Sequence, residues 1–319
     1  MRYFVTGCAG FIASHLVDRL LALGHEVVGY DNLVTGRVEF LIQARKNPYF
    51  KFNQYDVLDF QNLLASMPAA CDAVFHFAAN ADVRGGINHT DKDLKQNTIA
   101  TFNVLEAMRI KAIKRIIFPS TGSIYGEAPL IPTPEDAPFP IQTSLYGASK
   151  LAAEGLIQAY CEAFAMQSYI FRFVSILGER YTHGHVFDFY KQLYSDPSLL
   201  KILGDGEQKK SYLYIHDCID AMFIALEKAH EKINIFNLGT DHYCQVNDSI
   251  RWICKALGLS PQLDYRGGKR GWIGDNPFIF LDCRKIRGLG WEPKLRIEEA
   301  IVKTVDDLVS NSHCMEAKV

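Results

Sequence analysis

The stretch VTGCAGFIASHL, Val5 to Leu16, decides the fold of this chain of 319 residues. It follows an apolar run, RYFVT, and opens a segment whose apolar residues recur at helical spacing, so it joins a buried strand to a helix. In that context Gly7 and Gly10 predict a loop whose backbone amides approach a pyrophosphate, because the N-terminus of a helix favours anions. Ala13 stands where a third small residue lets helix and strand pack closely. The loop therefore predicts binding of a dinucleotide.

Composition excludes several classes of protein. Hydrophobic residues make up 48% of the chain, enough for a large core, and the formal charge is −2. A chain without basic excess does not neutralise the phosphates of a nucleic acid, and no apolar run approaches the ~20 residues that span a bilayer. The 8 cysteines form no CxxC pair, so we expect neither a zinc clip nor a disulfide framework, and we expect a cytoplasmic location. No signal peptide is expected, because Arg2 already begins a strand.

The alternation of strands and helices predicts a Rossmann-like, doubly wound α/β fold. The expected strands are RYFVT, EVVGYD, DAVFHFAA, RIIFPST, SYIFRF and INIFNLG, and helices are expected near 11–23, 93–109 and 146–165. A further helix, YIHDCIDAMFIALEKA, is expected to be capped by Asp217. The predicted domains are a dinucleotide-binding domain, 1–173 plus about 211–240, and a smaller C-terminal substrate-binding lobe, about 174–210 and 241–319.

The identity of the dinucleotide depends on Asp31, which ends the second expected strand, 21 residues after Gly10. A carboxylate at that place accepts hydrogen bonds from the hydroxyls of the adenosine ribose and repels the 2′-phosphate of NADP. NAD is therefore the predicted cofactor, although Arg37 nearby keeps NADP open.

Tyr146 and Lys150, in SLYGASK, lie four residues apart at the start of an expected helix, hence on one face. A phenol has a pKa near 10 and is a poor base at neutral pH. A neighbouring ammonium and the positive charge of a bound nicotinamide stabilise the phenolate and lower that pKa. The sequence PSTGSIYG ends a strand, where ligands of such sheets bind, and it offers the candidate hydroxyls Ser120, Thr121 and Ser123. The pattern predicts a tyrosine base with a lysine partner.

With these motifs the chain resembles the extended short-chain dehydrogenase/reductases, in their group of NAD-dependent nucleotide-sugar epimerases and dehydratases. The motifs occur in family order along nearly the whole chain: TGCAGFIASH, DNLVTGR, YDVLD, FHFAA, NTIATFNVLEAM, STGSIYG, YGASK, RFVSILG, GDGEQKKSYLYIHD and LGWEPK. The resemblance implies an enzyme in which Thr121 bonds the sugar hydroxyl, Tyr146 is the base and Lys150 is its partner. The cofactor contacts that it implies are Gly7, Gly10, Phe11, Ile12, Asp31, Asn32, Asp56, Val57, Phe77, Ala78, Ala79, Asn97, Ser120, Tyr146 and Lys150. His76 is interpreted as a core histidine.

The residues after Thr121 bear on the reaction. Dehydratases of the family carry an Asp-Glu pair there, whereas this chain has Gly122 and Ser123, so dehydration is not expected. No cysteine lies near Thr121, which argues against the epimerase–reductases that use one. The resemblance then favours a 4-epimerase that acts through a transient 4-keto sugar and returns the hydride to its other face. A nucleotide-sugar dehydrogenase or reductase, a 2-epimerase and, remotely, a non-catalytic NAD-binding sensor remain alternatives.

The resemblance places the substrate diphosphate at Ser175, Lys210 and Arg270, with Arg84 facing the sugar or its phosphate. Ser175 stands where the family often has Asn, and Lys210 replaces an Arg, which loses the bidentate contact to phosphate. UDP is expected from the family's majority, not from a residue that reads uracil. Family members usually dimerise through the helices near 93–109 and 146–165, so a homodimer is expected.

His183 and His185 suggest a metal site at first sight. Two histidines without a third ligand at proper spacing are a weak signal, and no metal is expected. The surrounding segment, GERYTHG, is expected to line the sugar pocket.

Overall fold

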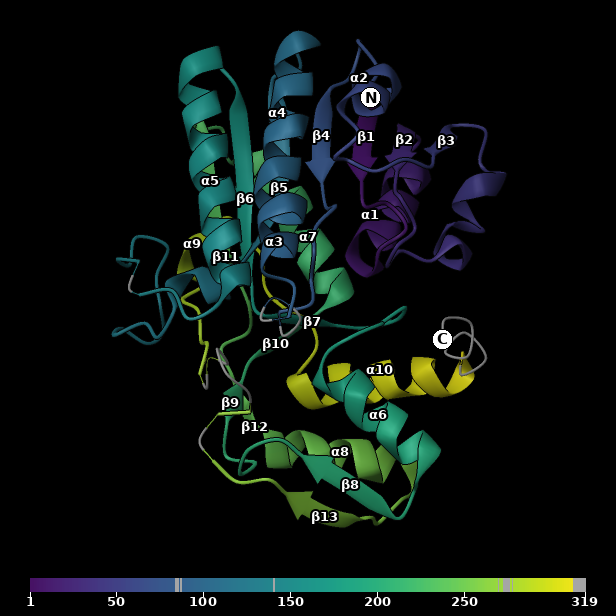
Figure 1. Cartoon of the computed structure of the whole chain (residues 1–319), viewed down its shortest axis with the longest axis vertical. Coiled ribbons are helices and arrows are strands. Elements are labelled where there is room, and N and C mark those ends of the chain that lie inside the picture. Colours follow the sequence, from purple (N-terminus) through teal and green to yellow (C-terminus); the bar gives the residue numbers. More distant parts are fainter. Residues whose placement is uncertain are drawn as a thin grey trace.

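Seven parallel strands form the main sheet, in the order β11-β6-β5-β4-β1-β2-β3 (Figure 1). They are β1 (Arg2–Thr6), β2 (Glu26–Tyr30), β3 (Phe50–Asn53), β4 (Ala73–His76), β5 (Arg115–Thr121), β6 (Gln167–Phe173) and β11 (Ile233–Leu238). The computed structural model describes residues 1–83, 86, 88–139, 141–268, 270–271, 276 and 278–311. Strand order reverses between β1 and β4, and in such sheets the ligand crevice opens at that reversal.

Helices cover both faces of the sheet, which explains why its strands are apolar without alternation. One face carries α1 (Phe11–Ala22) and α7 (Ile215–Lys228), and the other carries α2 (Phe60–Ser66), α4 (Ala100–Ile110) and α5 (Leu145–Phe164). Within β1, Val5 packs with the first set and its neighbour Phe4 with the second. The cluster around Val5 continues into the C-terminal elements through residues such as Ile250 and Ile301.

The smaller elements lie together beneath the main sheet in Figure 1. They are α6 (His185–Ser195), α8 (Val246–Leu257) and α10 (Ile297–Ser310), with the strand pairs β7 (Ser175–Leu177) and β10 (Tyr212–Tyr214), β8 (Leu199–Ile202) and β13 (Gln262–Tyr265), and β9 (Lys209–Lys210) and β12 (Cys244–Gln245). Local sequence sets the ends of α8: Gln245 and Asp248 form a capping box, and Gly258 ends the helix at φ +67°. Short helical turns are η1 (Val38–Leu41), η2 (Ala44–Lys46), η5 (Gly122–Tyr125) and α9 (Arg284–Arg287).

The predicted fold class is confirmed, and all six expected strands are present. The sequence did not indicate β3, because this strand has only four residues and they are partly exposed. The helix expected near 93–109 is divided into α3 (Thr90–Asp93), a π-helical turn η4 (Leu94–Ile99) and α4. The division into two domains stays a prediction.

The prediction that Asp217 caps α7 is wrong. The helix begins at Ile215, and Asp217 lies in its first turn. The Asp217 carboxylate instead accepts hydrogen bonds from the backbone N–H groups of Lys294 (3.0 Å) and Leu295 (3.2 Å). Across the described residues, no helix combines the length and the apolar character needed to cross a membrane.

Candidate active site

The glycine loop lies between β1 and α1, beside the loop that follows β4. Gly7 has φ +67°, in the left-handed region, and a Cβ there would lie 2.6 Å from the backbone N of Ala78. Both facts require glycine. The Ala78 N–H donates to the Thr6 hydroxyl (3.2 Å), and the Phe77 N–H donates to the Thr6 carbonyl (3.1 Å). Gly7 thus lets the loops after β1 and β4 meet at the crevice. The sequence did not indicate this requirement for glycine, which comes from packing within the chain.

The N-terminus of α1 offers donors for an anion. The helix begins at Phe11 after its N-cap Gly10, and among the described residues no side chain caps it. The N–H groups of Phe11 and Ile12 precede the first intrahelical hydrogen bonds, so they can serve a pyrophosphate. Ala13 is 2% exposed, as expected for the small residue between helix and sheet.

Asp31 and Asp56 lie beyond β2 and β3, where the adenosine part of a dinucleotide would be held. The Asp31 carboxylate is buried and accepts from the Ala9 N–H (2.9 Å), which fixes its orientation beside the glycine loop. The Asp56 carboxylate accepts from Asn32 Nδ2 (2.7 Å), and Val57 beside it is buried. The predicted ribose and adenine contacts are thereby brought together.

Ser120, near the end of β5, has a buried hydroxyl without a hydrogen-bond partner in the described part of the chain. Buried hydroxyls are ordinarily bonded, so this one calls for a partner beyond the described residues. The predicted contacts Phe77, Ala78 and Ala79 lie in the neighbouring loop after β4, partly exposed. Together with the α1 N-terminus and the Asp31 carboxylate, these donors and acceptors fit NAD.

Tyr146 lies in the first turn of α5. That turn is fixed by Ser144, whose side chain accepts from the Gly147 N–H (3.0 Å) and caps the helix. The Tyr146 hydroxyl lies near Thr121, at the end of β5, and the Thr121 hydroxyl lowers the pKa of the phenol. The structure therefore brings together the hydroxyl pair that the sequence predicted.

Lys150 follows one turn later on the same face of α5. It is 3% exposed, and its Nζ donates to the Pro119 carbonyl (2.9 Å) and lies 4.5 Å from the centre of the Phe118 ring. The strand that ends in Thr121 therefore also positions the lysine.

Burial raises the pKa of Tyr146 and lowers that of Lys150, and both shifts disfavour a phenolate beside an ammonium. Burial raises the pKa of Tyr146 to about 12, although the nearby Thr121 hydroxyl lowers it and the charge of Asp93 raises it further. Burial also lowers the pKa of Lys150 from 10.5 to about 7, against the carboxylates of Glu154 and Asp93, which raise it. A positive charge brought in by a cofactor would favour the phenolate.

A buried polar network lies behind the pair. Asn97 Oδ1 accepts from the Asn80 N–H (2.8 Å), and Asn97 Nδ2 donates to the Ser149 hydroxyl (2.9 Å), which in turn donates to the Tyr146 carbonyl (2.8 Å). Asp93 Oδ1 accepts from Asn80 Nδ2 (2.8 Å), and burial raises the Asp93 pKa. Asn97 lies in the π-helical turn, a feature frequent at functional sites. Sequence reasoning found Asn97 but missed Asp93, which precedes it by one helical turn and shares its face.

His76 is buried, as predicted for a core histidine. The Thr101 hydroxyl donates to the Asn97 carbonyl (2.6 Å), so it accepts from His76 Nε2 (3.0 Å), and His76 Nδ1 accepts from Thr6 (2.8 Å). Burial lowers the pKa of His76 to about 3, so the ring is neutral. It links the strand before the glycine loop to the helix that carries Asn97.

The predicted substrate residues border the loop after β5. Lys210 Nζ donates to the Asn276 carbonyl (3.1 Å), and Asn276 Nδ2 donates to the Gly126 carbonyl. Arg270 forms an ion pair with Glu127, and both side chains are about half exposed. Two of the predicted diphosphate contacts therefore lie beside Gly126 and Glu127, a few residues beyond Thr121.

Of the two remaining predicted substrate residues, the structure describes one. Ser175 is exposed at the start of β7, two residues after Phe173, which pairs with Thr121 between β5 and β6. Arg84 lies outside the described residues.

Comparison with known proteins relates this site to a family. The model of the "NAD dependent epimerase/dehydratase family" matches residues 3–239. The chain is similar to a UDP-glucose 4-epimerase of Mycolicibacterium smegmatis (32% identical, covering 96% of this chain and 98% of that protein). It is also similar to a UDP-glucuronate 4-epimerase of Thermodesulfobacterium geofontis (31% identical, covering 95% of each). Among solved structures, a crystal structure of a UDP-galactose 4-epimerase aligns with a TM-score of 0.87 at 36% identity, covering 98% of this chain and 99% of the other.

Proposed function

The chain belongs to the NAD-dependent epimerase/dehydratase family, as an enzyme of its nucleotide-sugar epimerase group, and on that premise we propose that it is a UDP-sugar 4-epimerase. The observation that carries the proposal is the meeting of Tyr146, in the first turn of α5, with Thr121 at the carboxyl end of β5. Directly after Thr121 the chain has Gly122 and Ser123, which offer no carboxyl group for the expulsion of water. Oxidation and reduction at one sugar carbon need no further acid or base.

In the proposed mechanism Tyr146 removes the proton of the sugar C4 hydroxyl and later returns it, while the Thr121 hydroxyl holds that oxygen in place. Lys150 supplies positive charge one helical turn from the phenol, and its bond to Pro119 keeps the ammonium near the end of β5. Bound NAD would supply the hydride acceptor and donor for this oxidation and reduction. Gly7, Gly10, Phe11, Ile12 and Asp31 would hold it along the crevice.

Lys210 and Arg270 would bind the substrate diphosphate, and Ser175, exposed at the start of β7, would lie at the edge of that site. Arg270 is half exposed and bound to a carboxylate that is itself half exposed, so the pair is weak enough to exchange for a phosphate. The proposal commits to UDP because all three epimerases named above are named for UDP-sugars, and it leaves the hexose to experiment.

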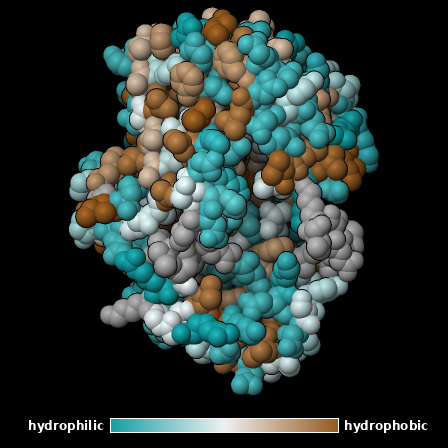
Figure 2. Space-filling model, in the orientation of Figure 1, coloured by the Kyte–Doolittle hydropathy of each residue, from teal (hydrophilic) through white to brown (hydrophobic). Residues whose placement is uncertain are grey.

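A homodimer is proposed from an exposed apolar face. Large apolar side chains are exposed along η4, α4 and α5, among them Ile99 (41%), Phe102 (44%), Ile110 (48%) and Phe164 (38%). Figure 2 shows apolar side chains gathered over this part of the surface. Contiguous exposed apolar surface marks an interaction site, and a second copy of the chain presents the same face. Light scattering during gel filtration should give twice the monomer mass, and Phe102→Glu should shift it toward the monomer.

The test of the activity uses the purified protein with UDP-glucose, UDP-N-acetylglucosamine and UDP-glucuronate in separate reactions followed by NMR. The expected result is interconversion of one C4-epimer pair from either side, with no net absorbance of NADH. Steady accumulation of NADH with substrate would identify a dehydrogenase and overturn the proposal. GDP-, CDP- and dTDP-sugars in parallel test the nucleotide.

A further inference from the structure

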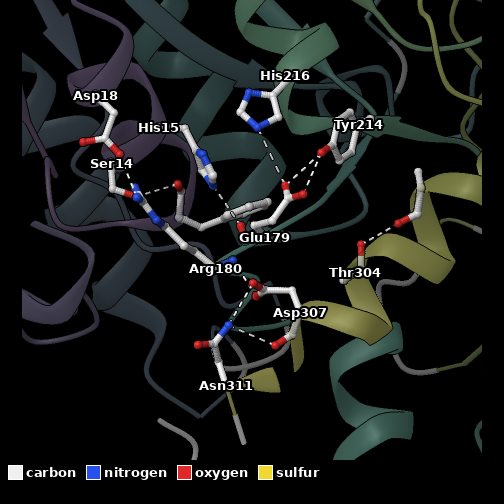
Figure 3. A network of polar contacts seen from close by, with 12 residues as sticks. Ser14, His15, Asp18, Glu179, Arg180, Tyr214, His216, Thr304, Asp307 and Asn311 are labelled. Atoms are coloured by element: carbon white, nitrogen blue, oxygen red, sulfur yellow. Dashed lines mark hydrogen bonds and ion pairs between the residues drawn. The ribbon is translucent and has the colours of Figure 1, made fainter. Parts of the chain in front are cut away.

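Three consecutive residues after β7 contact one face of α1, and we call them the clasp: Glu179, Arg180 and Tyr181. Their partners on α1 are Phe11, His15 and Asp18, which recur at helical spacing and so share one face. The sequence interpretation placed this segment in the sugar pocket. The segment instead contacts α1, which follows the glycine loop, and the C-terminal elements (Figure 3).

Each clasp residue uses a different contact to α1. The Tyr181 ring meets the Phe11 ring edge-on, with centroids 5.5 Å apart. The Glu179 carbonyl accepts from His15 Nε2 (2.9 Å), so that nitrogen carries the proton, and burial lowers the pKa of His15 to about 4. Arg180 Nη2 donates to Asp18 Oδ2 at 2.6 Å. The clasp thus holds α1 from its first residue through its second turn.

The same residues are tied to the C-terminal side of the chain. The Arg180 backbone N–H donates to Asp307 Oδ2 of α10 (3.0 Å), and the Tyr214 hydroxyl donates to Glu179 Oε1 (2.7 Å). The clasp therefore couples the position of α1 to β10 and α10 (Figure 3).

The backbone of Arg180 shows that this geometry is imposed by its surroundings. Its φ is +63°, in the left-handed region, which costs a residue other than glycine about 1–3 kcal/mol. Asp307 holds the backbone N–H and Asp18 holds the guanidinium, so two carboxylates from opposite sides keep the strained residue in place.

The clasp residues border a cleft that separates α1 from α10. The cleft has a volume of about 770 Å³ and is lined by Asp18 and Arg19 of α1, Ile219 of α7, and Leu308 of α10. Asp18 and Arg19 therefore face the cleft instead of packing against α10, whereas Phe11 is buried. The contacts of Arg180 with Asp18 and Asp307 bridge this cleft from α1 to α10.

We propose that the clasp is a positioning element for the cofactor: by fixing α1 through Phe11, His15 and Asp18, it holds the first-turn amides against the pyrophosphate and slows release of NAD. The inference rests on the cofactor cradle proposed above. Asp18 lies two turns along the same helix from Phe11, so on this proposal loosening Asp18 lets the amides of Phe11 and Ile12 shift.

The test measures how fast bound NAD leaves the intact protein, by trapping released NAD with excess of an NAD-consuming enzyme. Arg180→Met removes the guanidinium and should raise the dissociation rate about tenfold, which corresponds to ~1.4 kcal/mol. Asp18→Asn, isosteric and partly exposed, should give a similar increase, and the double variant no more than either single variant, because both remove one interaction. Arg180→Lys keeps the charge and should restore part of the retention.

Arg287→Met is the matched control. Arg287 pairs with Asp241 (2.6 Å), its side chain is 25% exposed against 24% for Arg180, and each has one buried guanidinium nitrogen without a partner in the described part of the chain. The thermal midpoint of NAD-free protein is recorded for every variant, so that general destabilisation is separated from loss of retention.

The outcomes separate the two proposals. An unchanged NAD dissociation rate in Arg180→Met and Asp18→Asn, or an equal increase in Arg287→Met, overturns the clasp while the cofactor cradle stands. A wild-type protein that binds no NAD overturns the cradle, and the clasp with it.

Discussion

Two arginine–glutamate pairs near the candidate site lie in opposite environments. Arg172 and Glu154, joining β6 to α5, are 2% and 0% exposed in their side chains and meet at 2.8 Å. Arg270 and Glu127 are 47% and 52% exposed. The Arg172 guanidinium also donates to the Tyr125 hydroxyl (2.6 Å), whereas the Arg270 side chain is about half exposed.

The difference separates architecture from ligand binding. A buried ion pair cannot lose one partner without leaving a charge in a medium of low dielectric, so it holds its elements together. An exposed pair is worth about 0–1 kcal/mol and can exchange its partner for a ligand. The buried pair therefore holds α5, the helix that carries Tyr146, in place, and Arg270 can exchange its partner for the diphosphate proposed above.

The largest expected effect is at Tyr146, in the buried region. Tyr146→Phe removes the proposed base and should lower kcat by about 10³-fold, within the range that acid–base groups contribute. The measurement is epimer formation by NMR, with the NAD content of the purified variant as control. Activity within tenfold of wild type would remove Tyr146 from the proposed mechanism.

The buried pair is tested next by stability. Arg172→Met should lower the free energy of unfolding by about 3–5 kcal/mol, because Glu154 is left buried without its partner. Denaturation by urea measures the change. The double variant Arg172→Met/Glu154→Leu should recover part of the loss, and a loss of under 1 kcal/mol in the single variant would erase the contrast between the two pairs.

The buried lysine predicts a pH-dependent stability of the NAD-free protein. The pKa of Lys150 is lowered from 10.5 to about 7, so between these values the unfolded chain binds more protons than the folded chain, and stability rises with pH. The cost of burying the ammonium is fully present below pH 7. Lys150→Met should therefore stabilise the protein by roughly 1–3 kcal/mol near pH 6, after allowing for the lost bond to Pro119. The gain should vanish near pH 10; a gain independent of pH would contradict the lowered pKa.

The smallest effects are expected in the exposed region. Arg270→Met should raise the KM for the nucleotide sugar about tenfold with little change in kcat, as expected when an interaction is equally strong in ground and transition states. Glu127→Gln should change the free energy of unfolding by less than about 1 kcal/mol. A fall in kcat as large as the rise in KM would move Arg270 into the reacting centre.

Local patterns in the chain were enough for most of the fold and for the centre of the site. Apolar runs and helical spacing predicted six strands of the main sheet, and four-residue spacing placed Tyr146 and Lys150 on one helix face. Patterns of this kind fail where the cause is distant. Asp217 looks like a helix cap, but Lys294 and Leu295, far along the chain, supply its partners. Asp93 carries no motif, and its role in the buried network depends on Asn80, which lies in another loop.

The sequence by itself determined a dinucleotide fold, a tyrosine–lysine pair and their order along the chain, because these follow from periodicity and from short motifs within single elements. Tertiary structure alone decided that Gly7 is required by the approach of Ala78, that Arg172 is buried while Arg270 is exposed, and that Glu179–Tyr181 face α1. The physical reason is burial. Dielectric environment, close approach and the partner of a charged group depend on which distant segments pack together, and no local pattern encodes that.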